Sequence, residues 1–440
     1  MEWERPEQRG RRGPVAWVTL AAAAFAVVAV SALGGGPAQP ASESDLLIEH
    51  TPADRRRPAA PIETPTGPPE GRWRSLEAGP LPHRRFPATV WTGREVLVWG
   101  GAEPRSGYLD ASADGAAYDP AVDGWRTLPA GPLAPRFAPA AVWAGDRMVV
   151  WGGLGQSTPG VATELIDGAS YDPEGDVWRV LSPAPLPGRF GAVVAWTGEE
   201  AVVWGGSGGT PSTLRRLRDG AAYDPAADRW RKLPGAPAID GPAPVAGAWS
   251  GTELVVWDGR NAIAYDPSRN SWRVLPPAPL SDDAAAAVVW TGDEVAVLGL
   301  DVPNRPDAYG VAYNPNADRW RIVRRPRGLP WRVGGGATAT AAGRAVALWQ
   351  QPSGFPPPPS RDPTPGMWLW RPDTDTWAAS PRPGASGMDP NIVWTGREVL
   401  LWTTPRPHAR PAGHGWSPTS TLSGYAPRHQ HAGHTSPLEG

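Results

Sequence analysis

A phrase of apolar and turn residues, Val90 to Gly101, is repeated along this chain with gradual loss of identity. In the copies an apolar run ends at a short turn that contains glycine, and a second apolar run follows. Glycine accepts the positive φ that a two-residue hairpin turn requires, so each copy predicts a β-hairpin. The runs are short and almost wholly apolar, which predicts strands buried on both faces. Further copies begin at Val142, Ala195, Ala248, Val289, Thr340 and Val393.

A second phrase follows the hairpins and places a tryptophan a fixed distance after a tyrosine. In the first copy Tyr118-Asp119-Pro120 leads to Trp125. Asp-Pro favours a turn and proline cannot donate to a strand ladder, so the phrase predicts strand, tight turn, strand. Each unit therefore contains four short strands. The same spacing joins Tyr171 to Trp178, Tyr223 to Trp230, Tyr265 to Trp272 and Tyr313 to Trp320.

The repeat length and its glycines resemble a known motif. The units recur roughly every fifty residues, and a Gly-Gly doublet such as Gly100-Gly101 closes the second run before the tyrosine and the tryptophan. Together these features resemble the kelch motif, and residues 72–428 are similar to the central domain of galactose oxidase. The resemblance implies an all-β fold, a seven-bladed kelch-type β-propeller. The doublet is lost after the third unit, where Asp258-Gly259 replaces it.

The resemblance does not extend to galactose oxidase activity. That enzyme depends on a copper-bound tyrosine crosslinked to cysteine, and this chain contains no cysteine. We therefore expect the fold without the copper radical chemistry, and no cofactor.

The repeats begin and end with incomplete units, and these two units complement each other. Trp73-Arg74-Ser75-Leu76 has the signature of an outermost strand but no hairpin before it, whereas Tyr425-Ala426-Pro427 has no tryptophan after it. We expect the segment around Trp73 to supply the outermost strand of the last unit, which closes the ring and removes exposed strand edges.

The chain begins with a segment typical of membrane insertion. Residues 1–13 carry four arginines, and residues 14–33 are twenty residues without a charge, which is long enough to span a bilayer as a helix. The preceding arginines predict a cytoplasmic N-terminus and an extracytoplasmic remainder. The alternative is a cleaved signal peptide, which would make the protein secreted. Residues 34–71 are rich in proline and predict a disordered linker.

The amino-acid composition limits the possible binding partners. The net charge of −2 gives no electrostatic case for nucleic-acid binding. Most of the 25 tryptophans occupy repeat positions, which predicts structural roles. Residues 429–440 predict a disordered tail, in which His429, His431 and His434 could chelate a transition metal. The simpler interpretation is an ordinary tail, and we expect no metal site.

The candidate site lies where the loops vary. The connections from second to third strands differ in length between units, and variable loops on a rigid scaffold usually carry binding residues. Arg85, Arg136 and Arg189 each precede a phenylalanine before an innermost strand, and Asp283 occupies the corresponding place in a later unit. These side chains could ring the channel mouth and bind an anion. Alternatively, each arginine pairs with an aspartate of a neighbouring blade or with a backbone carbonyl.

The sequence therefore predicts a monomeric, membrane-anchored extracytoplasmic propeller that binds or scaffolds a surface protein or an envelope glycan. The first alternative is a carbohydrate-active enzyme with its site at the arginine-lined mouth. Such an enzyme needs a converging acid and base, and the aligned positions offer only Asp283, so we expect no catalysis. The second alternative is a structural spacer without a ligand.

Overall fold

The computed structural model describes residues 71–82, 84–105, 108–158, 161–209, 214–241, 245–280, 287–300, 305–326, 337–350, 367–380, 388–404 and 421–427. The predicted cytoplasmic segment, membrane span, linker up to residue 70 and histidine-containing tail lie outside these ranges, as does Asp283. Within the ranges, every element is a β-strand, and no helix has the length and apolarity that crossing a membrane requires.

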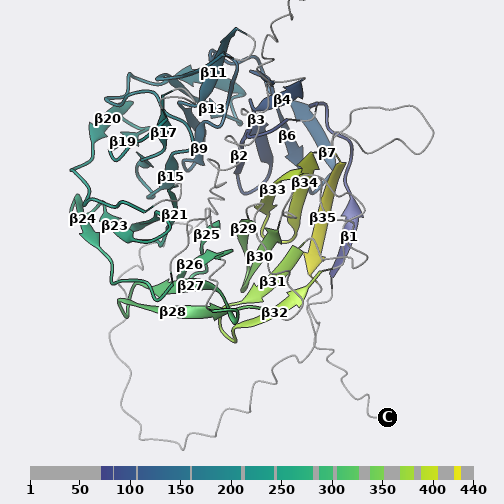
Figure 1. The fold of residues 1–440 in the computed structure, drawn as a ribbon. Helices are drawn as coiled ribbons and strands as arrows, with labels where there is room; N and C mark the ends of the chain where they lie inside the picture. The colour runs from purple at the N-terminus through teal and green to yellow at the C-terminus, as the bar shows by residue number, and fades with distance from the viewer. Residues whose placement is uncertain are drawn as a thin grey trace, which may run out of the picture.

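The described strands form seven four-stranded antiparallel sheets arranged around a ring (Figure 1). The first four sheets, from the innermost strand outward, are β2 (Ala88–Trp91), β3 (Val96–Trp99), β6 (Gly115–Asp119), β7 (Gly124–Thr127); β9 (Ala140–Trp143), β10 (Met148–Trp151), β13 (Gly168–Asp172), β14 (Val177–Val180); β15 (Val193–Trp196), β16 (Ala201–Trp204), β19 (Gly220–Asp224), β20 (Arg229–Lys232); and β21 (Ala246–Trp249), β22 (Leu254–Trp257), β23 (Ala262–Asp266), β24 (Ser271–Val274).

The other three sheets are β25 (Ala287–Trp290), β26 (Val295–Leu298), β27 (Ala308–Asn314), β28 (Arg319–Arg324); β29 (Ala337–Ala342), β30 (Ala345–Gln350), β31 (Met367–Arg371), β32 (Thr376–Ala379); and β33 (Met388–Trp394), β34 (Val399–Thr404), β35 (Thr421–Pro427), β1 (Gly71–Ser75). Each innermost strand contacts the innermost strand of the next sheet, and β33 contacts β2, so the cycle closes.

The predicted hairpins are confirmed. Strands β2 and β3 pair with Trp91 opposite Val96, and Gly93 between them has a φ of 95°. The Thr92 hydroxyl accepts a hydrogen bond of 2.9 Å from the Glu95 amide, which fixes the turn. All four residues of β3 are buried, as the apolar run predicts, whereas Thr89 and Trp91 of β2 are only partly buried, so the prediction of burial on both faces is wrong for β2.

The predicted pairing of the chain's two array ends is also confirmed. Strand β1 lies antiparallel to β35, with Trp73 opposite Tyr425, and Figure 1 shows the purple strand beside the yellow one. The Trp73 indole donates a 3.0 Å hydrogen bond to the Ser380 hydroxyl in the neighbouring sheet. The first described strand therefore completes the last sheet.

Tryptophans join neighbouring sheets. Trp99 of β3 is fully buried, and its ring lies 5.5 Å from that of Trp178, in the outermost strand of the next sheet. The Trp178 indole in turn donates to the Pro129 carbonyl at 3.1 Å, in the connection that leaves the first sheet. These tryptophans are therefore structural. The same ring pairing recurs as Trp151–Trp230, Trp204–Trp272 and Trp257–Trp320.

The sixth sheet keeps the architecture although two of the repeat residues are replaced. Ala341 takes the place of the innermost tryptophan, and Trp370 takes the place of the tyrosine. The Trp370 indole donates to Asp375 at 3.0 Å, just as the Tyr118 hydroxyl donates to Asp123 at 2.6 Å in the first sheet. Indole replaces phenol as the donor, so the turn stays fixed.

Candidate functional site

The first three sheets each carry an additional hairpin between their second and third strands. These hairpins are β4 (Ala102–Arg105) with β5 (Tyr108–Ala111), β11 (Leu154–Thr158) with β12 (Val161–Glu164), and β17 (Ser207–Gly208) with β18 (Arg215–Arg216). We call the three hairpins together the platform. In the fourth sheet, by contrast, only residues 258–261 connect β22 to β23. Among the connections that the structure describes, the variable ones predicted from the sequence therefore form a surface over the first three sheets, and the fourth sheet has only a short connection.

The platform hairpins contact one another. Strand β5 lies against β11, and the Ala111 amide donates to the Gln156 side chain at 3.3 Å. The Glu164 carboxylate accepts a hydrogen bond from the Gly209 amide, which joins the second hairpin to the third. An apolar cluster centred on Ala102, Phe137 and Phe190 lies beneath them. The platform is thus held together by contacts between sheets.

A buried arginine fixes the base of each platform hairpin. Arg136 is 0 % exposed, and its guanidinium donates to the carbonyls of Gly152 and Asp167 at 3.1 and 3.2 Å and to the Asp167 carboxylate at 3.0 Å. Since β10 ends before Gly152 and β13 begins after Asp167, one side chain ties together both ends of the hairpin segment.

The same arrangement recurs in the two adjacent sheets. Arg84 donates to the Gly100 carbonyl at 3.0 Å and forms an ion pair with Asp114. Arg189 donates to the Gly205 carbonyl at 3.0 Å and to the Asp219 carboxylate at 2.9 Å. Burial lowers the pKa of the Arg189 guanidinium from its ordinary value, against the opposing effect of the Asp219 carboxylate.

The predicted arginine set needs one correction, because Arg84 and not Arg85 matches Arg136 and Arg189. Each matching arginine lies four residues before an innermost strand. The residue two positions after it has a positive φ: 54° at Phe86, 52° at Ala138 and, in the third sheet, 60° at Gly191. Arg85 instead forms a backbone bridge with Ala102, and its guanidinium lies 5.0 Å from the Phe86 ring.

Arg136 and Arg189 do not form an open ring of guanidinium groups at the channel mouth. Both are buried and bound to aspartates and carbonyls, which is the alternative interpretation of the sequence, except that the aspartate belongs to the same sheet and not to a neighbouring one. Ligand binding by Arg85 stays a prediction. We call each buried arginine with its aspartate a clamp. In the first three sheets a sequence signal marks it, because an aspartate stands directly before the glycine that begins the third strand, as Asp114, Asp167 and Asp219.

Charged groups also join neighbouring sheets at the hairpin turns. Arg126 of the first sheet forms an ion pair of 2.7 Å with Glu95 and donates at 3.0 Å to the hydroxyl of Tyr171 in the second. Burial, together with the hydrogen bond to Asp176, raises the pKa of Tyr171 to about 12, so the phenol remains a donor. Related groups are Arg74–Glu398–Tyr118–Asp123, Arg231–Glu200–Tyr265–Asn270 and Arg273–Glu253–Tyr313–Asp318.

These junctions predict acid sensitivity. Burial alone would raise the pKa of Asp123, but hydrogen bonds from Tyr118 and the Glu77 amide, with the charge of Arg74, hold it below its ordinary value of 3.8. The pKa of Asp318 is likewise lowered by its hydrogen bonds. A carboxyl with a lowered folded-state pKa stabilises the fold above its unfolded-state pKa and loses this contribution as the pH falls. We therefore expect the free energy of unfolding to decrease below about pH 4.

The measurement is urea unfolding as a function of pH. The double variant Asp123→Asn, Asp318→Asn should show a shallower decrease in unfolding free energy below about pH 4, because asparagine does not titrate. Asn270 occupies the same position naturally and accepts from the Tyr265 hydroxyl at 2.8 Å, so the substitution fits the site. An acid dependence identical to that of the wild type would contradict the assignment.

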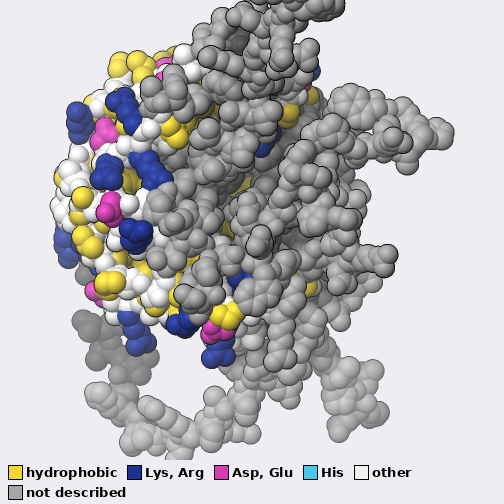
Figure 2. Space-filling view, in the orientation of Figure 1, with side chains coloured by type: hydrophobic (Ala, Val, Ile, Leu, Met, Phe, Trp, Pro, Cys, Tyr) yellow, Lys and Arg dark blue, Asp and Glu magenta, His cyan; other side chains and the backbone are white. Residues whose placement is uncertain are grey.

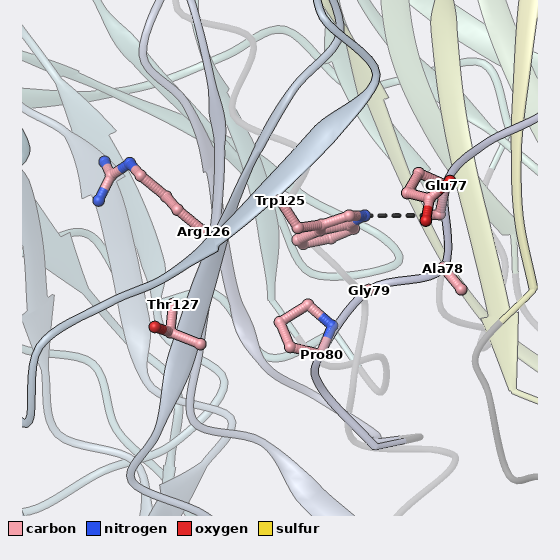
Figure 3. Close-up of a pocket in the computed structure, with 7 residues that line it drawn as sticks. All are labelled: Glu77, Ala78, Gly79, Pro80, Trp125, Arg126 and Thr127. Carbon is pink, nitrogen blue, oxygen red and sulfur yellow. Dashed lines mark hydrogen bonds between the residues drawn. The ribbon is translucent and has the colours of Figure 1, made fainter.

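A shallow groove of about 580 Å³ lies between β7 and the connection that follows β1 (Figure 3). The Trp125 indole donates to the Glu77 carbonyl at 3.0 Å, and the Arg126 side chain points away from the Trp125 ring. A Cβ on Gly79 would lie 2.9 Å from Trp125, so glycine permits this close packing. Gly131 lies against Trp178 in the same way, so we interpret the groove as a recurring packing joint between sheets.

In the ranges that the structure describes, no group of three or more histidine, aspartate or glutamate side chains is positioned to hold a metal ion. The C-terminal histidines lie outside those ranges.

Part of the chain is similar to a known kelch-like protein. Kelch-like protein 35 of Mus musculus is 34% identical over 128 residues, which is 29% of this chain and 19% of that protein. The chain thus matches about a fifth of its relative's length. No protein-family profile matches the chain. The partial similarity and the repeated four-stranded antiparallel sheets together support kelch repeats folded as a β-propeller.

Proposed function

We propose that this chain is a seven-bladed kelch-type propeller that binds a partner protein through the platform, outside the membrane to which its N-terminus anchors it. The platform carries the proposal. Three adjacent hairpins are joined laterally and clamped at their bases by buried arginines, so the surface is ordered before any partner arrives. A preorganised surface loses little conformational entropy on association, which favours binding.

Different observations support the number of blades and the membrane anchor. The seven sheets whose innermost strands contact one another in a closed cycle support seven blades. The uncharged residues 14–33, with arginines before them, support a membrane span, and the proline-rich residues 34–71 would hold the propeller away from the bilayer. Membrane attachment and an extracytoplasmic location are therefore proposals from the sequence.

Binding fits the platform better than catalysis does. A glycoside hydrolase requires two carboxyl groups that converge on one bond. The aspartates at the platform bases, Asp114, Asp167 and Asp219, each pair with a different buried arginine and lie in three separate sheets. These aspartates therefore stabilise the bases of the hairpins.

The test is crosslinking capture by the full-length chain in its native membranes. Ile166 is 63% exposed beside the platform, and Val180 is 62% exposed on the outer strand β14. We expect a crosslinked partner that is lost with Ile166→Asp and retained with the matched control Val180→Asp. Equal capture by both variants would exclude the platform as the interface. A rise in melting temperature with envelope glycans, in place of a protein crosslink, would favour the glycan alternative, since a ligand at 100 times its Kd stabilises by about 2.7 kcal/mol.

A further inference from the structure

The platform ends abruptly at the boundary between the third and fourth sheets. The first hairpin is flanked by the second, and the second by the third, through the Ala111–Gln156 and Gly209–Glu164 contacts. In the described part of the chain no further hairpin flanks β18, because the fourth sheet has only the short connection of residues 258–261. One side of β18 therefore faces a step down to the fourth sheet. We call this place the step.

The step is rich in arginine. Arg215 and Arg218 are exposed, and within the described ranges neither forms an ion pair. Arg260, on the short connection, is exposed as well. Arg216 extends across the boundary and donates to the Gly241 carbonyl of the next connection. Figure 2 shows Lys and Arg side chains on the surface in the region that β19 and β23 occupy in Figure 1.

The first hairpin provides a contrast within the same platform. Its arginine, Arg105, lies 2.9 Å from the Glu103 carboxylate and 3.4 Å from that of Asp110, so its charge is neutralised locally. At the step the exposed carboxylates are Asp219, which forms an ion pair with the buried Arg189, and Asp240, which accepts a hydrogen bond of 3.2 Å from the Asn261 side-chain amide. The excess of positive charge is therefore specific to the third hairpin.

An apolar side chain lies among these charges. Leu214 directly precedes β18 and is 43% exposed, next to Arg215 and Arg216. Guanidinium groups bind carboxylates, whereas an exposed leucine favours contact with apolar side chains. A polypeptide with both acidic and apolar residues satisfies the two requirements together better than a sulfated sugar does.

We infer that the step binds an extended acidic segment of a partner protein, with its carboxylates on Arg215, Arg218 and Arg260 and an apolar residue against Leu214. This inference rests on the proposed protein-binding function and adds the chemistry of the segment that is recognised.

The experiment measures binding of a fluorescent synthetic peptide of alternating glutamate and leucine to the full-length chain by anisotropy. We expect affinity that weakens with added salt, because exposed charges are screened over about 10 Å at 0.1 M ionic strength. The double variant Arg215→Glu, Arg218→Glu should bind about tenfold more weakly. The matched control is Arg229→Glu, Arg319→Glu, which reverses two exposed arginines on outer strands and should bind like the wild type.

Equal binding by the wild type and the step variant, or equal loss in the step variant and the control, would overturn the inference. Binding of a sulfated oligosaccharide that depends on Arg215 and Arg218, without binding of the peptide, would also overturn it. If the peptide fails while Ile166→Asp still abolishes partner capture, the platform remains a protein-binding surface and only the acidic chemistry at the step is wrong.

Discussion

Arg136→Ala should lower the free energy of unfolding by about 3 kcal/mol, because it removes all the hydrogen bonds that the guanidinium donates at the base of the second hairpin. The carbonyls of Gly152 and Asp167 would lose their charged donor, and a fully buried side chain would leave a cavity. The Asp167 carboxylate is 49% exposed and can be hydrated, which keeps the cost from being larger. Urea unfolding of the full-length chain measures this change.

The control separates a buried clamp from an ordinary ion pair. Arg94 also pairs with an aspartate, Asp119 at 3.3 Å, but its side chain is 82% exposed. Exposed pairs contribute about 0–1 kcal/mol, so Arg94→Ala should change stability little. Arg136→Lys should remain destabilising, because an ammonium cannot reproduce the planar set of donors. If Arg136→Ala and Arg94→Ala cost the same, the clamp does not support the platform.

Hydrogen exchange would locate the effect. Loss of the clamp should increase exchange of the amides in β11 and β12 more than in β9 and β10, since the clamp holds the ends of the hairpin and not the sheet itself. Uniform acceleration across the second sheet would instead indicate general destabilisation.

The sheets could be predicted from the sequence because their determinants are local. A glycine with positive φ between two apolar runs specifies a hairpin whatever its surroundings, as Gly93 does. The pairing of β1 with β35 spans almost the whole array, yet it follows from two incomplete repeat units that together make a complete one.

The arginine clamp could not be assigned with the same certainty, because its partners are distant in sequence. Arg84 and its aspartate are 30 residues apart. Successive residues of an extended segment point in opposite directions, so the sequence does not show which residue of the pair Arg84-Arg85 points inward. The burial and hydrogen bonds of its guanidinium show that Arg84 points inward, whereas the Arg-Phe pattern indicates its neighbour. The junction of Arg126 with Tyr171 was missed for a related reason, because it links two repeats that the motif treats separately.

Trp73→Ala should destabilise the protein by about 3 kcal/mol, because this side chain holds the strand that closes the ring. Trp73 packs against the apolar cluster that the sixth and seventh sheets share, and its indole reaches Ser380. The side chain is only half-buried, which places the cost at the lower end of the range for tryptophan truncation. Deleting residues 1–80 should cost more, because it removes β1 and leaves the edge of β35 unpaired, and an unpaired edge promotes association between chains.

Two comparisons make this prediction specific to closure. Val180→Ala changes an outermost strand of the second sheet at a residue that is 62% exposed, and it should alter the unfolding free energy by no more than about 0.5 kcal/mol. Trp73→Phe keeps an aromatic ring and loses the indole donor. Its loss of unfolding free energy should therefore lie between those of Val180→Ala and Trp73→Ala. Unfolding of Trp73→Ala at the urea concentration of the wild type would mean that β1 does not stabilise the ring. The proposed anchor lies in the segment that precedes β1. The strand that closes the ring is therefore also the strand that would connect the ring to the membrane.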